Sequence, residues 1–223
     1  MYKYELLNNH YIVHIDDRKY LIDTGSHSFW ITTPMSHIAI DGKSYPLQPC
    51  PLSPTAKEKT FNLVGTEVDG FIGLDIISRT SLTIYKNGDI DFKVNELPNG
   101  KKVPLVGNGL LTVKASSGCI SGLMVIDTGA MYGYGIKEIF QGETPFATGV
   151  HDFNPNPRIW DMYSDMYHQD VFVNGKLINL DMGYNPKTYG YPLGGNIIMV
   201  GNLTTFFDEV CVIDMTNRQL ILK

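Results

Sequence analysis

The stretch that decides the fold reads L-I-D-T-G-S at residues 21–26, and it returns almost unchanged as V-I-D-T-G-A at residues 125–130. In both copies an apolar pair precedes Asp-Thr-Gly. A shuffled chain of the same composition seldom contains this tripeptide twice, so the repetition indicates an internal duplication of the chain.

Further features recur in the same order in each half of the chain. A pair of strand-like segments precedes each Asp-Thr-Gly, and another strand–turn–strand pattern follows it. An apolar-apolar-Gly element comes next, before a short helical stretch and a last strand–turn–strand pattern. The corresponding segments are 11–22 and 110–126, 37–47 and 170–180, 71–73 and 199–201, and 83–92 and 212–222.

The two halves differ in length. The polar segment 96–102 has the composition of a linker, which predicts an N-terminal half of residues 1–97 and a C-terminal half of residues 98–223. The interval from the Gly of Asp-Thr-Gly to the apolar-apolar-Gly element is 48 positions in the first half (73 − 25) and 72 in the second (201 − 129). We therefore expect an insertion in the second half, around residues 142–170.

The predicted fold class is mainly β with few short helices. Strand-like segments are rich in β-branched and aromatic residues, and Asn-Gly and Asp-Gly pairs mark turns between them. Short helical segments are expected only at 76–80, 136–140 and 203–207. With 43% hydrophobic and 18% charged residues over 223 positions, the chain can form a sizeable core without disulfides or metals.

Charge and cysteine content disfavour several classes of function. A net charge of −5 without a Lys/Arg-rich stripe argues against nucleic-acid binding. No apolar run approaches the roughly 20 residues of a membrane span, and the first ten residues lack an apolar signal core. The three cysteines and six histidines show no metal-ligand spacing and no disulfide pattern, so we expect no metal or cofactor and a cytoplasmic location.

Taken with these patterns, the chain resembles the pepsin-like aspartic peptidases, the two-lobed relatives of the retroviral-type, or retropepsin-like, enzymes. The matching motifs are D-T-G-S-H-S-F-W-I at 23–31, G-F-I-G-L-D at 70–75 and most of the closing segment 197–222. They cover both halves in order, at shorter intervals than in the digestive members of the family. The resemblance implies a bilobal acid-protease fold, in which two β lobes are related by a pseudo-twofold axis.

The resemblance also implies that Asp23 and Asp127 form a catalytic dyad. Two carboxylates about 3 Å apart cannot both ionise at low cost, so such a pair shares one proton over a wide pH range. The ionised carboxylate takes a proton from a water, and the protonated one hydrogen-bonds to the peptide carbonyl that this water attacks. In the family, Thr side chains bond to the opposite loop, a role that falls here to Thr24 and Thr128.

Glycines accompany both expected catalytic loops. Gly25 and Gly129 suit a loop whose backbone runs close beneath the carboxylates, where a side chain would not fit. Gly73 and Gly201, from the apolar-apolar-Gly elements, would let a strand pass close behind each loop.

The two loops differ at the third residue after the aspartate, which is Ser26 in the first and Ala130 in the second. A hydroxyl can donate to a carboxylate and stabilise its ionised form, whereas a methyl group cannot. This difference predicts that Asp23 is more often ionised, that Asp127 holds the shared proton, and that the pH optimum is only mildly acidic.

The family's Gly-rich flap, with a Tyr near its tip, has no clear counterpart between residues 31 and 70. Tyr45 is a weak flap candidate, because its hairpin matches a segment of the second half and is better explained as framework. The insertion around Trp160 either covers the substrate cleft or is a surface excursion with a small apolar cluster. Trp30 either lines a substrate pocket or packs in the core under the first loop.

Two polar residues outside the loops are expected to be structural. Asp75 follows the first apolar-apolar-Gly element and suits the N-terminus of a helix better than the role of a third catalytic acid. Asn202 begins a formal N-glycosylation sequon, but it follows Gly201 in an element that should be packed, which disfavours modification.

The sequence therefore predicts a small, monomeric aspartic endopeptidase that binds a peptide or protein substrate in extended form, as an added strand. The alternative is a catalytically silent peptide-binding module on the same fold, which the two intact Asp-Thr-Gly copies disfavour. Pairing of half-chains between molecules is disfavoured as well, because one chain carries both halves.

Overall fold

The structure is a computed structural model that describes residues 1–94, 97–107, 109–154, 160–184 and 196–223. It confirms the prediction of a mainly β class. The elements of the first half are β1 (Tyr2–Leu7), β2 (His10–Ile15), β3 (Arg18–Asp23), β4 (Phe29–Trp30), β5 (His37–Ile40), β6 (Lys43–Pro46), β7 (Gln48–Pro49), α1 (Pro54–Val64), β8 (Gly70–Gly73), α2 (Leu74–Thr80), β9 (Leu82–Tyr85) and β10 (Asp89–Asp91). Those of the second half are β11 (Lys101–Val106), β12 (Thr112–Ser117), β13 (Ile120–Ile126), β14 (Gly133–Gly135), the 3-10 helix η1 (Lys137–Phe140), β15 (Ala147–Asn154), β16 (Trp160–Val173), β17 (Lys176–Tyr184), β18 (Ile197–Gly201), β19 (Val210–Asp214) and β20 (Gln219–Leu222).

The pairing of strands around each Asp-Thr-Gly is the same in both halves. In the first half, β3 forms an antiparallel hairpin with β2 and lies parallel to β8, while β4 lies antiparallel to β8 and parallel to β7. In the second half, β13 has the same relation to β12 and β18, and β14 lies antiparallel to β18 and parallel to β17. The repeated sequence pattern thus corresponds to a repeated strand arrangement.

The strands of the second half form a closed barrel. Its order is β12, β13, β18, β14, β17 and β16, and β16 pairs with β12 again to complete the ring of six strands. In the first half, β5 and β6 form a separate two-stranded sheet instead. β16 spans 14 residues and pairs with β12, β15 and β17, whereas β5 spans four residues and pairs with β6.

Residues 142–170, where an insertion was expected, contain β15 and most of β16. These two strands pair with each other from Asn154↔Trp160 back to Ala147↔Met166. Residues 155–159, between them, lie outside the described residues, as do residues 95–96 at the expected boundary between the halves. The additional chain length of the second half is therefore used to build a hairpin on the outside of the barrel.

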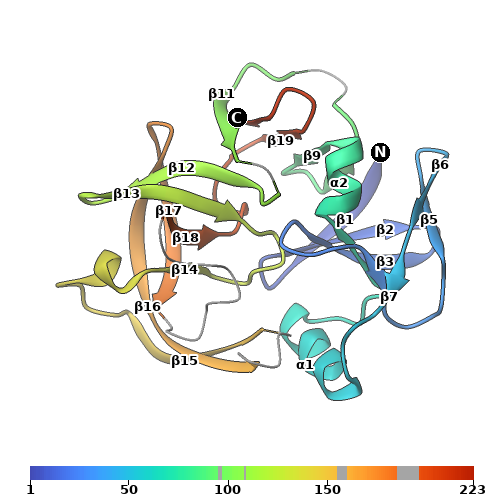
Figure 1. Cartoon of the computed structure of the whole chain (residues 1–223), viewed down its shortest axis with the longest axis horizontal. Helices are drawn as coiled ribbons and strands as arrows, with labels where there is room; N and C mark the ends of the chain where they lie inside the picture. Colours follow the sequence, from blue (N-terminus) through green and yellow to red (C-terminus); the bar gives the residue numbers. More distant parts are fainter. Residues whose placement is uncertain (95–96, 108, 155–159, 185–195) are drawn as a thin grey trace.

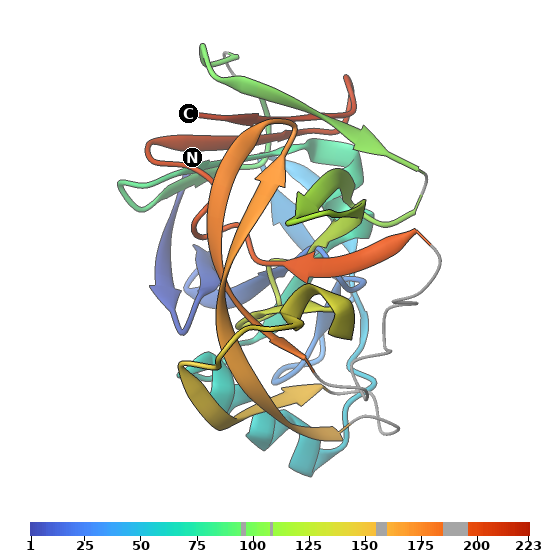
Figure 2. The ribbon, with the colours of Figure 1, turned by 90° about the vertical axis from the view of Figure 1, so that its left-hand side faces the viewer.

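One antiparallel sheet joins the two halves, in the order β1, β10, β9, β19, β20 and β11. Its central pair, β9 and β19, comes from different halves and places Ile84 opposite Cys211. Figures 1 and 2 show β9, β11 and β19 of this sheet at the top, with α1 and β15 on the opposite side of the molecule. The main hydrophobic core beneath the sheet contains buried side chains of both halves, which ties them into one packed unit.

Helix α1 was not expected from the sequence. It begins where the hydroxyl of Ser53 accepts the N–H of Ala56 at 3.2 Å and Pro54 occupies the first turn, and it ends at Gly65, whose φ is +88°. The expected helical segment 203–207 forms a hydrogen-bonded turn and no helix, whereas 76–80 and 136–140 fall largely within α2 and η1. Neither helix of the described chain has the length and apolarity needed to span a membrane.

Candidate active site

The two Asp-Thr-Gly loops have matching local geometry. Asp23 ends β3 and Asp127 follows β13, and each carboxylate accepts the N–H of the glycine two residues later at 2.9 Å. The N–H of the third following residue donates to each aspartate's own carbonyl, at 3.2 Å from Ser26 and 3.3 Å from Ala130. In each loop the backbone therefore reverses in the same tight turn, directly under the carboxylate of the aspartate.

Thr24 and Thr128 lock the two loops together. The hydroxyl of Thr24 donates to the carbonyl of Ile126 at 2.8 Å and accepts the N–H of Thr128 at 3.0 Å. The hydroxyl of Thr128 makes the reciprocal pair of bonds, donating to Ile22 at 2.7 Å and accepting from Thr24 at 3.0 Å. Both threonines are at most 1% exposed. Four hydrogen bonds thus cross between the halves in a site that water does not reach.

The carboxylate of Asp23 lies directly against the second loop. A Cβ atom built on Gly129 would come within 2.5 Å of Cγ and Oδ1 of Asp23, so only glycine fits there. Gly73 is equally restricted, because its Cβ would collide with the backbone of Ser26 and His27. A Cβ atom built on Gly201 would lie 2.9 Å from Sδ of Met124. This side-chain atom can move aside more easily than the backbone atoms that restrict Gly73.

The electrostatics of the pair differ from the sequence-based expectation. Burial, and after it the negative charge of Asp127, raise the pKa of Asp23 to about 8. Hydrogen bonds from Ser26 and Gly25 lower the pKa of Asp23, but by less. This direction is opposite to the prediction that Asp23 is the more often ionised partner, because one hydroxyl does not offset enclosure beside a second carboxylate.

The first loop is held by its own half of the chain. The N–H of Leu74 donates to the carbonyl of Ser26 at 2.9 Å. Asp75 accepts both the N–H and the hydroxyl of Ser28, at 2.8 and 2.7 Å, and that hydroxyl accepts the N–H of Gly73 at 2.8 Å. Asp75 lies in the first turn of α2 and acts as a brace behind the loop.

The second loop is held by residues that the sequence did not single out for this role. His10 Nε2 lies 3.1 Å from the carbonyl of Gly129, and the amide of Asn9 donates to Met131 at 2.9 Å. The amide of Asn202 donates to the carbonyls of Ala130 and Asn9. Asn202 is 4% exposed, consistent with its expected packing. The signal in the sequence that could have indicated these contacts is the Asn8-Asn9 pair, which marks a turn ahead of a strand.

A cavity of about 70 Å³ lies beside Asp23 and Gly129. Thr60 and Leu63 of α1 form one wall, and Asp152 and Phe153 of β15 form another. The other lining residues are His10, Leu21, Val64 and Phe71. Because liquid water occupies about 30 Å³ per molecule, this space holds roughly two waters and no peptide side chain of ordinary size.

Helix α1 and strand β15 meet across this cavity from opposite halves of the chain, at the lower side of Figure 1. Lys59 Nζ lies 2.5 Å from an oxygen of Asp161, which also pairs with His151 at 2.9 Å. The same ammonium group lies 5.6 Å from the centre of the Phe153 ring. Asp161 belongs to β16, next to Phe153 of β15. We refer to α1 and β15, bridged by the contact of Lys59 with Asp161 on the neighbouring strand, as the cover.

Of the aromatic cleft candidates, neither Tyr45 nor Trp30 lines the cavity beside Asp23. Tyr45 is 7% exposed and packs in the main core, opposite Ile38 of the same hairpin. Trp30 is partly buried against the same core, with its backbone paired to Gly70. Trp160 begins β16, and its side chain lies outside the described part of the structure. The wall next to Asp23 is formed instead by α1, which the sequence did not predict.

Neither metal-binding groups nor comparisons with known proteins assign a function to this site. Within the described residues, no group of three or more His, Cys, Asp or Glu side chains is arranged to hold a metal ion. Cys50, Cys119 and Cys211 are free thiols. No protein-family model matches this chain, and no curated protein matches it either.

Proposed function

We propose that this chain is an aspartic endopeptidase with the bilobal pepsin-like fold, and that Asp23 and Asp127 are its catalytic residues. The observation that carries the proposal is the pair of Asp-Thr-Gly loops, which place two carboxyl groups together and are locked by reciprocal threonine bonds. The coupling of the two carboxyls, which raises the pKa of Asp23, supplies the acid and the base that peptide hydrolysis needs.

The chemistry follows from one proton shared by two carboxyls. Ionised Asp127 takes a proton from a bound water while the water oxygen forms a bond to the peptide carbonyl carbon. Asp23 gives its proton to the carbonyl oxygen, so the intermediate is a neutral gem-diol. The C–N bond then breaks as the nitrogen takes the proton from Asp127, and Asp23 regains a proton from one of the diol hydroxyls. Both carboxyls return to their starting states.

A second candidate is a peptide-binding module without turnover, and the narrow cavity under the cover favours it. The two candidates separate in one experiment. The protein is incubated with a diverse peptide library from about pH 3 to pH 9, with and without a statine-type inhibitor, and the products are identified by mass spectrometry. Inhibitor-sensitive cleavage supports the peptidase. Inhibitor binding by the folded protein without any cleavage supports the module.

The pH dependence should reflect the proton on Asp23. Peptide hydrolysis is expected to decline above about pH 8, because the pKa of Asp23 is raised to about 8. Loss of the Asp23 proton leaves two carboxylates and no acid. Stability should also fall as pH rises from about 4 to 8, since the folded chain holds this proton more tightly than the unfolded chain does. Rate profiles and denaturant unfolding across this range measure both effects.

An Asp23→Asn variant is the control for the stability arm of that experiment. Asparagine does not titrate, so its unfolding free energy should lose the part of the pH slope that Asp23 contributes. A slope between pH 4 and 8 that is the same in the variant and the parent protein would contradict the assignment of the proton to Asp23.

We propose that a substrate reaches Asp23 when α1 and β15 move apart. Lys59→Ala removes the ion pair of the cover, and a partly exposed pair of this kind contributes about 0.2–1 kcal/mol. We expect KM for a peptide substrate to fall by up to about fivefold at low salt, with kcat unchanged. The matched control is Lys3→Ala, which breaks a 2.5 Å pair with Asp89 far from the cavity. A KM that rises, or that changes equally in both variants, would contradict the role of the cover.

A further inference from the structure

Three successive carbonyls of the second loop each accept a hydrogen bond from a side chain. Gly129 is bonded by His10, Ala130 by Asn202 and Met131 by Asn9. Asn9 lies in the turn between β1 and β2, and His10 begins β2, more than a hundred residues away in the sequence and in the other half of the chain. The position of the second loop therefore depends on the end of the β1–β2 hairpin in the first half, residues Asn8, Asn9 and His10, which we call the corner.

The first loop is braced in a different way at the equivalent positions. The carbonyl of Ser26 accepts a backbone N–H, that of Leu74 immediately after Gly73. In the second half the residue after Gly201 is Asn202, and its side-chain amide takes over this bond to Ala130. The hydroxyl–carboxylate contact between Ser28 and Asp75 also belongs to the first loop alone, because Tyr132 and Leu203 occupy the matching positions. The second loop thus uses contacts between the halves in place of local ones.

The corner has a rigid local structure. Asn8 and Asn9 both adopt left-handed φ values, +45° and +64°, which is the two-residue hairpin turn that asparagine tolerates well. Leu7 pairs with His10 across this turn, so β2 begins at His10 with its direction fixed. The amide of Asn202 also donates to the carbonyl of Asn9 at 2.9 Å, which joins the turn to the end of β18.

His10 is suited to donate and not to ionise. A carbonyl accepts only from an N–H, so Nε2 carries a hydrogen in the bond to Gly129. The side chain is 3% exposed, and burial lowers its pKa. The hydrogen bond to Gly129, the charge of Asp152 on β15, a hydrogen bond to Leu7 and the charge of Asp127 on the second loop oppose this shift but do not outweigh it. Neutral His10 is therefore the stable form next to the dyad.

We propose that His10, together with Asn9 and Asn202, is a positioning residue that holds the Asp127 loop at its working distance from Asp23. This inference rests on the proposed peptidase function. His10 bonds the carbonyl two residues after Asp127, in the same turn whose glycine N–H donates to the Asp127 carboxylate. Loss of the bond frees a buried carbonyl and lets the carboxylate shift, and misplacement of a reacting group by about 1 Å can cost a hundredfold in rate.

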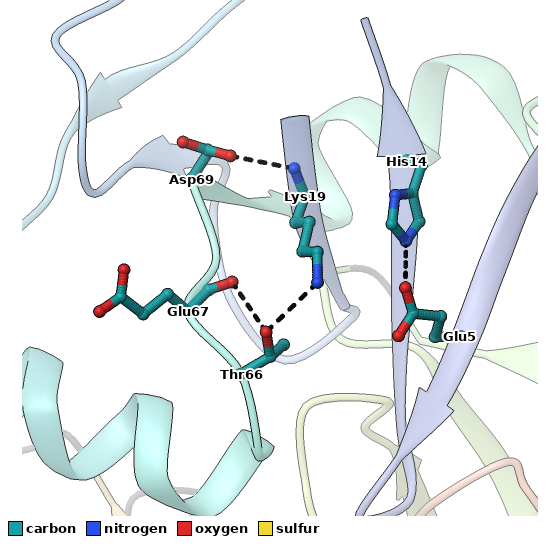
Figure 3. A network of polar contacts seen from close by, with 6 residues as sticks. All are labelled: Glu5, His14, Lys19, Thr66, Glu67 and Asp69. Atoms are coloured by element: carbon teal, nitrogen blue, oxygen red, sulfur yellow. Dashed lines mark hydrogen bonds and ion pairs between the residues drawn. The ribbon is translucent and has the colours of Figure 1, made fainter. Parts of the chain in front are cut away.

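The test exploits the geometry of two amide side chains. Glutamine places an NH₂ group near the position of the histidine Nε2 atom, whereas asparagine reaches only as far as Nδ1. His10→Asn should lower kcat about tenfold to a hundredfold while KM changes less than about twofold, and His10→Gln should restore most of kcat. His14 lies on the same strand, pairs with Glu5 at 2.7 Å on the surface (Figure 3) and gives the matched control His14→Gln.

A second measurement does not depend on activity. Hydrogen exchange of the backbone amides of Gly129 and Ala130 should accelerate in His10→Asn and stay close to the parent rate in His10→Gln and His14→Gln. Equal kcat and equal exchange in the Asn and Gln variants would overturn the positioning role. An inactive parent protein, with the exchange difference present, would contradict the peptidase function and leave the positioning of the loop supported.

Discussion

Asp127→Asn is expected to lower kcat for peptide hydrolysis by about 1,000-fold or more while leaving the chain folded. Asparagine has nearly the same shape as aspartate and still accepts the N–H of Gly129, but it cannot take a proton from the attacking water. Asp127 is 6% exposed, so buffer bases have little access to replace it. The rates are compared on one cleaved peptide under single-turnover conditions.

The control for this substitution is Asp208→Asn, which changes the net charge equally at an exposed position outside the cavity. Its kcat should match that of the parent protein. Unfolding curves of both variants show whether the chain remains folded. Retention of more than about a tenth of the parent rate in Asp127→Asn would exclude a dyad mechanism, since one carboxyl cannot serve as both acid and base in the same step.

Thr24→Val is expected to destabilise the chain by about 2–6 kcal/mol. The substitution leaves the N–H of Thr128 and the carbonyl of Ile126 without their partner, and a buried unsatisfied group costs about 1–3 kcal/mol. For a chain of this size the midpoint of thermal unfolding should fall by about 5–20 °C. Differential scanning calorimetry or circular dichroism measures the change.

Thr24→Ser is the matched variant, because it keeps the hydroxyl and loses only a methyl group. Its unfolding midpoint should remain within a few degrees of the parent value. If valine and serine shift the midpoint equally, the cross-bonds contribute nothing and the effect comes from packing alone. Thr24→Val should also lower kcat, because the same bonds fix the distance between the two loops.

Secondary structure could be predicted from the sequence where neighbouring residues alone specify it. The mainly β class could be predicted because alternating apolar residues and Asn-Gly turns specify strands from their immediate neighbours. Helix α1 was missed because its residues 54–64 are mostly polar, and its start depends on one capping serine and one proline.

The sequence alone determined the duplication, because two Asp-Thr-Gly tripeptides in matching strand patterns are legible without any long-range contact. Only the tertiary structure decided how the copies are used. It places His10 against Gly129, puts α1 beside Asp23 and raises the pKa of Asp23. Each of these depends on groups far apart in the chain, and burial and the approach of a second charge arise only when the two halves pack together.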